Sequence, residues 1–168
     1  VPAPPADANK LERLMAMTRG RPVVVAASTH PGEEEILTET HRTLAGFFPK
    51  LLTVIVPRHP DRGEAIARMI AASGLNPTLR SHEDLPTATT DIYVADTMGE
   101  LGLFYRLAPI VFMGGSLVEH GGQNPIEAIK LGASIVHGPH VFNFADVYEA
   151  LDSARGARRA DTQEMLVK

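Results

Sequence analysis

The chain alternates short apolar runs, rich in β-branched residues, with longer segments of helical periodicity. The runs do not alternate between polar and apolar residues, which is typical of parallel strands covered on both faces. Between them, residues such as Ile66, Met69 and Ile70 return at helical spacing. The pattern predicts an α/β fold built on a doubly wound parallel sheet. Predicted strands are 23–27, 51–56, 77–80, 91–95, 110–113 and 134–136, and predicted helices are 33–47, 61–74, 98–107, 125–131 and 143–151.

Composition excludes several classes of protein. The 168 residues fit one domain, and 44% hydrophobic with 21% charged residues is a normal supply for its core. The absence of cysteine excludes disulfides, thiolate nucleophiles and cysteine-ligated metal centres. A net charge of −4 argues against general nucleic-acid binding. Every apolar stretch falls far short of the roughly 18 residues that a transmembrane helix needs, so none is predicted.

The sequence divides into three parts. Residues 1–20 are predicted to be a Pro-rich linker and a first helix; the linker does not resemble a signal peptide, and the missing initiator Met indicates a fragment. Residues 21–152 would form the α/β domain. Residues 153–168 form a basic C-terminal segment, which we expect to be shortened relative to a full domain.

Several predicted helices begin at a similar motif. A capping residue is followed three positions later by Glu in 61–64, 97–100 and 124–127, and Asn143 is placed to cap the last helix. Helix N-termini carry unpaired amides and the positive end of the helix dipole. Several of them at one sheet edge predict an anionic ligand.

The loop after the first predicted strand contains Ser28, His30 and Gly32. Its hydroxyls, imidazole and glycine are suited to contacting an anion. The glutamates that follow favour a different role, because negative charge stabilises the first turn of a helix. A metal site of His30 with Glu33 or Glu34 is the weaker interpretation, since the spacing is not that of an HExxH motif.

The loop after the second predicted strand reads Pro57-Arg58-His59-Pro60. Two prolines restrict its backbone and would hold Arg58 as a bidentate donor to phosphate. A surface arginine in a rigid turn explains the tetrapeptide equally well. His59 would donate a hydrogen bond to a ligand or cap the turn.

Glycines follow the strand predicted at 110–113. Gly115 and Ser116, with Gly121 and Gly122 further on, would let backbone amides approach a ligand closely. The pattern is neither GxGxxG nor a Walker loop. Glu127 either closes a helix cap or accepts hydrogen bonds from ribose hydroxyls. The histidines at 137 and 140 are not accompanied by the carboxylate of a usual metal site, so no metal is expected.

Six of these motifs occur in one order over about residues 20–150, and together they resemble the C-terminal half of 3-deoxy-D-manno-octulosonic acid (Kdo) transferases. They read STHPGEE (28–34), PRHP (57–60), DTMGEL (96–101), GGSL (114–117), GGQNPIE (121–127) and GPHVFNF (138–144). That family has the GT-B architecture of two Rossmann-like domains. The resemblance implies that this chain is one half, a Rossmann-like domain that binds CMP-Kdo.

The resemblance also assigns roles. Arg58 would meet the CMP phosphate or base, Met98 and Gly99 would frame the cytosine, Asn124 would meet phosphate and Glu127 the ribose. Two positions depart from the family pattern, where His usually stands at Gln123 and Leu at Ile126. The full set of predicted substrate-binding residues is Ser28, His30, Gly32, Pro57, Arg58, His59, Met98, Gly99, Gly115, Ser116, Asn124 and Glu127.

The resemblance implies a metal-independent, inverting transfer of Kdo from CMP-Kdo to a lipid A precursor in lipopolysaccharide biosynthesis. No cofactor is expected, and the catalytic base would lie in the N-terminal half, so this fragment alone would be inactive. The full enzyme would act at the cytoplasmic face of the inner membrane, while the fragment would be soluble. The alternatives are another GT-B domain, of a UDP-sugar transferase or epimerase, and a non-catalytic nucleotide-binding domain.

Overall fold

The computed structural model describes residues 7–115, 134–137 and 157–159. Their strands form one sheet of order β3-β4-β2-β1-β5-β6-β7, and every neighbouring pair is parallel. This confirms the predicted doubly wound sheet. The strands are β1 (Val23–Thr29), β2 (Leu52–Pro57), β3 (Pro77–Leu79), β4 (Ile92–Val94), β5 (Ile110–Met113), β6 (Ser134–His137) and β7 (Ala157–Arg159).

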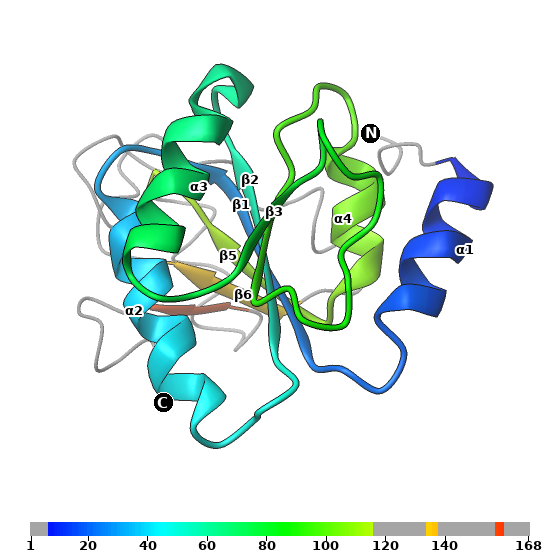
Figure 1. Ribbon diagram of the computed structural model, residues 1–168. Coiled ribbons are helices and arrows are strands. Elements are labelled where there is room, and N and C mark those ends of the chain that lie inside the picture. The colour runs from blue at the N-terminus through cyan, green and yellow to red at the C-terminus, as the bar shows by residue number, and fades with distance from the viewer. Residues whose placement is uncertain (1–6, 116–133, 138–156, 160–168) are drawn as a thin grey trace.

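Helices cover both faces of the sheet (Figure 1). One face carries α2 (Glu33–Ala45) and α3 (Gly63–Ala72), and the other carries α1 (Ala8–Met17) and α4 (Leu101–Leu107). A short 3₁₀ helix, η1 (Pro60–Arg62), precedes α3. Parallel strands need such crossovers, because a tight hairpin can join only antiparallel neighbours.

Two separate apolar cores follow from this layering. On the α2 and α3 side, Leu37, Ile66 and Ile70 pack against the sheet. On the other side, Leu14 of α1 and Phe104 of α4 do the same. Burying a side chain of this size contributes about 1.5–3 kcal/mol, so both faces of the sheet add to stability. This is the reason why the central strands are mostly apolar and do not alternate between polar and apolar residues.

The first predicted helix is present as α1. Asp7 caps it, since one of its carboxylate oxygens accepts hydrogen bonds from the amides of Asn9 at 2.9 Å and Lys10 at 3.1 Å. Leu14 is one of the apolar residues whose helical spacing predicted this helix. In the structure it faces the sheet and is fully buried.

The predicted capping motifs are wrong at two helices. Asp61 lies within η1, and α3 begins at Gly63 after Arg62 without a side-chain cap. At 97–100, the Thr97 hydroxyl donates to the Glu100 carboxylate at 2.6 Å instead of capping a backbone amide, and α4 begins only at Leu101. Both caps were predicted from the local sequence. At the second one, Glu100 binds Arg80 and Lys10, which are distant in the sequence, and so does not close the cap. The motif at 124–127 and the Asn143 cap lie outside the described residues.

Strand β7 is a further departure, because 157–159 lies in the segment predicted to be a basic tail. It pairs with β6 in parallel. Within the part of the chain that the structure describes, no helix is long and apolar enough to span a bilayer.

Candidate functional site

The carboxyl ends of the strands meet at one edge of the sheet. Strand order changes direction there between β1 and β5. The chain passes from β1 to β2, then to β3 at the edge and back to β4 between β3 and β2, and it then crosses to β5 on the other side of β1. In doubly wound sheets, ligands bind in the crevice at such a point. We call the loops at this place the ligand edge, and define it as residues 28–33, 57–59, 96–100 and 114–115.

Strand β1 ends irregularly at the ligand edge. Its register with β2 shifts between Ala27 and Thr29. Between them, Ser28 has φ 56°, and it is the one non-glycine residue of the described part with positive φ. Such a conformation costs about 1–3 kcal/mol and persists only where surrounding contacts impose it. The bulge therefore marks a place where the fold maintains strain.

Gly114 supplies the contact that faces Ser28. Its amide donates to the carbonyl of Ala27 at 2.7 Å. A Cβ atom at Gly114 would lie 2.2 Å from the carbonyl oxygen of Ser28. Only glycine allows the backbones following β1 and β5 to approach this closely.

The side chain of Glu33 links the loops that follow β1 and β5. Its side chain is fully buried at the start of α2. Its Oε1 atom accepts hydrogen bonds from the amide of His30 at 2.9 Å and from the amide of Gly115 at 2.6 Å. Residues 82 positions apart in the sequence are thereby joined through one carboxylate oxygen.

The loop after β2 presents a cation. The amide of Arg58 donates to the carbonyl of Thr29 at 3.0 Å, which fixes the backbone of Arg58 to the β1 loop, while its side chain is exposed. Beside it, the rings of His30 and His59 meet edge to face with centroids 6.1 Å apart. The backbone of Arg58 is thus fixed in place, and its exposed guanidinium is accessible to a ligand.

The loop after β4 is held at both ends. Asp96 accepts hydrogen bonds from the amide of Ser81 at 2.9 Å and from its hydroxyl at 2.6 Å. Between Asp96 and the start of α4, Met98 is 80% exposed and Gly99 adopts a φ of 74°. An exposed, flexible thioether side chain is suited to packing against a planar ligand group.

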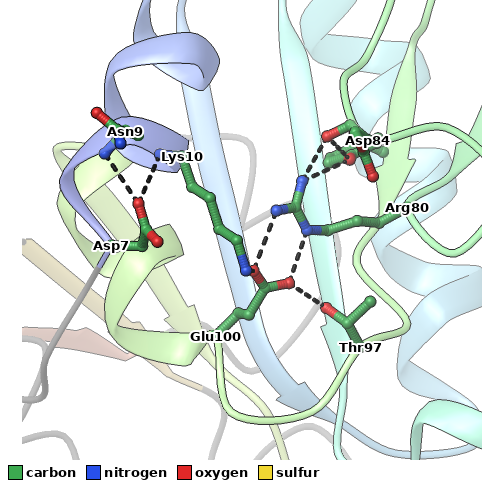
Figure 2. A network of polar contacts seen from close by, with 8 residues as sticks. Asp7, Asn9, Lys10, Arg80, Asp84, Thr97 and Glu100 are labelled. Atoms are coloured by element: carbon green, nitrogen blue, oxygen red, sulfur yellow. Dashed lines mark hydrogen bonds and ion pairs between the residues drawn. The ribbon is translucent and has the colours of Figure 1, made fainter.

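Glu100 is the other anchor of this loop, and it is the centre of a polar network (Figure 2). It accepts from Arg80 Nε at 2.7 Å and Nη2 at 3.1 Å, from Lys10 Nζ at 3.2 Å and from Thr97 Oγ1 at 2.6 Å. The hydrogen bonds from Arg80 lower the pKa of Glu100 to about 2. Helix α1, the loop after β3 and the loop after β4 are tied together through this carboxylate.

Arg80 extends the network into the core. Its Nη1 donates to the hydroxyl of Tyr93 at 3.0 Å and to the carbonyl of Asp84, and its guanidinium lies 5.5 Å from the ring centroid of Phe104. Burial raises the pKa of the Tyr93 hydroxyl to about 12, so it remains a neutral donor and acceptor. A hollow of about 220 Å³ borders the network and is lined by Lys10, Arg13, Arg80, Asp84, Leu85, Thr97 and Glu100.

No group of three or more metal-ligating side chains lies together among the residues described here. The weaker interpretation of His30 with Glu33 or Glu34 as a metal site gains no support from the geometry. Glu33 accepts from backbone amides, and Glu34 pairs with Arg62 at 2.9 Å.

No protein-family model matches the sequence. A solved structure does: the C-terminal CMP-Kdo binding domain of WaaA from Acinetobacter baumannii is 33% identical, with a TM-score of 0.88. The match covers 95% of this chain and 84% of that one. The chain belongs to the Kdo transferase family. It corresponds to the C-terminal domain of that family.

Curated Kdo transferases agree with this assignment. The 3-deoxy-D-manno-octulosonic acid transferase of Haemophilus influenzae is 41% identical over 149 residues, which are 88% of this chain and 35% of that protein. A probable mitochondrial Kdo transferase of Arabidopsis thaliana is 40% identical over 134 residues, covering 79% of this chain and 30% of the plant protein. The chain therefore spans about a third of the length of these Kdo transferases.

The structure brings most of the predicted Kdo transferase site residues to the ligand edge. Ser28 lies near the end of β1, and His30 and Gly32 follow it. Pro57 ends β2, and Arg58 and His59 follow it. Met98 and Gly99 follow β4, and Gly115 follows β5. The amide of Gly115 is already bound by Glu33, so a ligand contact from Gly115 would use other atoms. Ser116, Asn124 and Glu127 lie outside the described residues. The ligand roles of all twelve stay predictions.

Sequence reasoning missed two features of this Kdo transferase domain. It placed Glu33 in the first turn of a helix, which is correct, but it did not reveal that Glu33 is buried and bridges two loops. It also overlooked Arg80, whose partner Glu100 is 20 positions away. The capping pattern at 97–100 drew attention to Glu100, but no local signal pointed to its partners on α1 and after β3.

Proposed function

We propose that this chain is the donor-binding domain of a Kdo transferase and binds CMP-Kdo at the ligand edge. The observation that carries the proposal is the match to a domain described as CMP-Kdo binding, at 33% identity over 95% of this chain. The ligand edge also has the place in the fold that such a ligand would occupy. Several loops converge there at the point where strand order reverses, which is where doubly wound sheets bind nucleotides.

Charge at the ligand edge supports an anionic ligand. The guanidinium of Arg58 is exposed, and its backbone is tied to β1 by the hydrogen bond to Thr29. A guanidinium binds a phosphate through two parallel hydrogen bonds and keeps its charge at every physiological pH. In this proposal Arg58 neutralises the phosphate of the donor, Met98 packs against the base, and no divalent cation is required.

The complete enzyme, in this proposal, transfers Kdo to a lipid A precursor with inversion at the anomeric carbon. In this proposal the acceptor and the catalytic base belong to the other half of a GT-B enzyme; this chain spans about a third of the length of its Kdo transferase relatives. Transfer takes place at the cytoplasmic face of the inner membrane, where the lipid acceptor is reached through that other half.

Calorimetric titration with CMP tests the proposal. We expect binding that is equal in EDTA and in Mg²⁺, because Arg58 supplies the counter-charge. Arg58→Ala should weaken binding about tenfold, in line with the loss of a hydrogen bond between charged groups. Arg68→Ala is the matched control, because Arg68 is an exposed arginine in the middle of α3, and it should leave the affinity within about twofold.

Titration with UMP separates the related alternative. A CMP-Kdo site should prefer CMP, whereas a domain for UDP-sugars should bind UMP at least as well. Binding that depends entirely on Mg²⁺, or no binding of CMP by the folded protein, would contradict the proposed function.

A further inference from the structure

Glu33 occupies an unusual place for a carboxylate, since it is fully buried beside a proposed phosphate site. Its neighbour Glu34 is equally buried, and Arg62 donates to both oxygens of Glu34, at 2.9 and 3.2 Å. Glu33 receives backbone amides from two different loops of the ligand edge. The contacts of Glu34 with Arg62 therefore join α2 to η1, whereas these contacts of Glu33 join two loops of the ligand edge.

The hydrogen bonds of Glu33 continue through the backbone to Arg58. The amide of His30 points at Glu33, and the carbonyl of Thr29 belongs to the same trans peptide group, so it points the opposite way. That carbonyl accepts the amide of Arg58 at 3.0 Å. One chain of hydrogen bonds thus runs from Gly115 through Glu33 and the peptide before His30 to Arg58, and it joins the loops after β5, β1 and β2.

We propose that Glu33 is the positioning residue of the ligand edge. By accepting both amides it fixes the peptide plane before Gly115 and the peptide plane before His30, and through the latter it sets the position of Arg58. A ligand that touches the three loops then meets them already arranged, and little binding free energy is lost in ordering them. This inference rests on the proposed CMP-Kdo site, and it adds a residue that need not touch the donor.

Variants of Glu33 and Glu34 test the inference by CMP titration of folded protein, with melting temperatures measured in parallel. Glu33→Ala removes the acceptor and should weaken CMP binding about tenfold or more. Glu33→Gln keeps an acceptor oxygen of the same reach and should retain affinity within about threefold. Glu34→Ala, the matched control, breaks a buried ion pair and should lower the melting temperature while CMP affinity stays within about twofold.

Glu33→Asp serves if the alanine variant does not fold, because its side chain is one methylene too short to reach both amides, and it should weaken CMP binding about fivefold or more. Amide hydrogen exchange gives a second readout, in which Gly115 and His30 should lose protection in Glu33→Asp and keep it in Glu34→Ala. A folded Glu33→Ala or Glu33→Asp protein that binds CMP as tightly as Glu34→Ala would overturn the inference. Failure of the wild-type protein to bind CMP would instead overturn the proposed function on which it rests.

Discussion

At the scale of single residues, the ligand edge depends on backbone groups that a sequence pattern does not reveal. Ser28 is held at φ 56°, and Gly114 leaves no room for a side chain against the carbonyl of Ser28. The two observations belong together, because the bulge at the end of β1 turns that carbonyl toward β5. This close approach is what requires glycine at position 114. Its backbone does not, because Gly114 is not among the glycines with positive φ.

Gly114→Ala should therefore be strongly destabilising. The added Cβ would lie 2.2 Å from the backbone oxygen of Ser28, at the carboxyl ends of two paired strands that cannot easily move apart. Overpacking of a core usually costs about 1–3 kcal/mol, and we expect about 3 kcal/mol or more here because both groups are backbone. Urea denaturation followed by circular dichroism measures the change.

Gly46→Ala is the control for this measurement. Gly46 follows α2 with φ −64°, and the nearest atom to an added Cβ is the carbonyl oxygen of Thr43 at 3.3 Å. Its substitution should change the free energy of unfolding by less than about 1 kcal/mol. A Gly114→Ala protein as stable as Gly46→Ala would mean that the loops after β1 and β5 do not approach each other as described.

At the scale of elements, the Glu100 network fixes how α1, α4 and the loop between β4 and α4 meet. Lys10 comes from α1, Arg80 follows β3, and Glu100 directly precedes α4 (Figure 2). The side chain of Glu100 is only 15% exposed, so its hydrogen bonds are partly shielded from water. The same carboxylate anchors the loop that carries Met98 and Gly99.

Glu100 should make stability depend on acid pH. Arg80 lowers the pKa of Glu100 from 4.5 to about 2, so the folded state favours the ionised form. This contribution is complete above the unfolded pKa of 4.5 and is lost as pH falls from 4.5 toward 2. Glu100→Gln should lower the free energy of unfolding by about 1–3 kcal/mol at pH 7, and the difference from wild type should shrink below pH 4.5 and vanish near pH 2.

Denaturation curves at pH 7, 4 and 3 measure this difference. Glu12→Gln on the exposed side of α1 is the control, and it should follow the wild-type protein at each pH. A gap between wild type and Glu100→Gln that stays constant from pH 7 to pH 3 would show that Arg80 does not favour the charged carboxylate.

At the scale of the whole molecule, a donor site on one domain is only half of a transferase. Inverting transfer needs a base within about 2.6–3.2 Å of the acceptor proton, and the buried carboxylates described here are held by other partners. Glu33 accepts from backbone amides, Glu34 from Arg62 and Glu100 from Arg80. Alignment of donor and acceptor lowers a barrier by roughly 7–11 kcal/mol, which a single domain that holds only the donor does not achieve.

We therefore expect this chain to bind CMP-Kdo and to transfer no sugar by itself. Kdo transfer to a lipid A precursor is measured with this chain alone, and then with the N-terminal half of a Kdo transferase added in trans. Product should be absent in the first assay, and any product should require the second polypeptide. Robust turnover by this chain alone would place a catalytic base within its 168 residues.

The sequence alone determined the architecture of this domain and which loops gather at one edge of its sheet. Strands such as 52–57, which are mostly apolar and do not alternate with polar residues, are typical of a sheet covered on both faces, so the doubly wound fold follows from local composition. Parallel strands end at one edge, and for this reason the sequence pattern predicts that the loops containing Ser28, Arg58 and Gly115 lie together.

Only the tertiary structure decided the partners within that edge. Glu33 and Gly115 are 82 positions apart, and Lys10 and Glu100 are 90 positions apart, so no local pattern encodes either pair. The same holds for helix starts: Thr97 and Glu100 have the spacing of a cap, but Arg80 and Lys10 offer Glu100 two cations in place of a backbone amide. Strand β7 was not predicted, because residues 157–159 do not form an apolar run. They join the sheet by pairing with the free edge of β6. Hydrogen bonds and charges act over a few ångströms in space, and the fold alone determines which residues come that close.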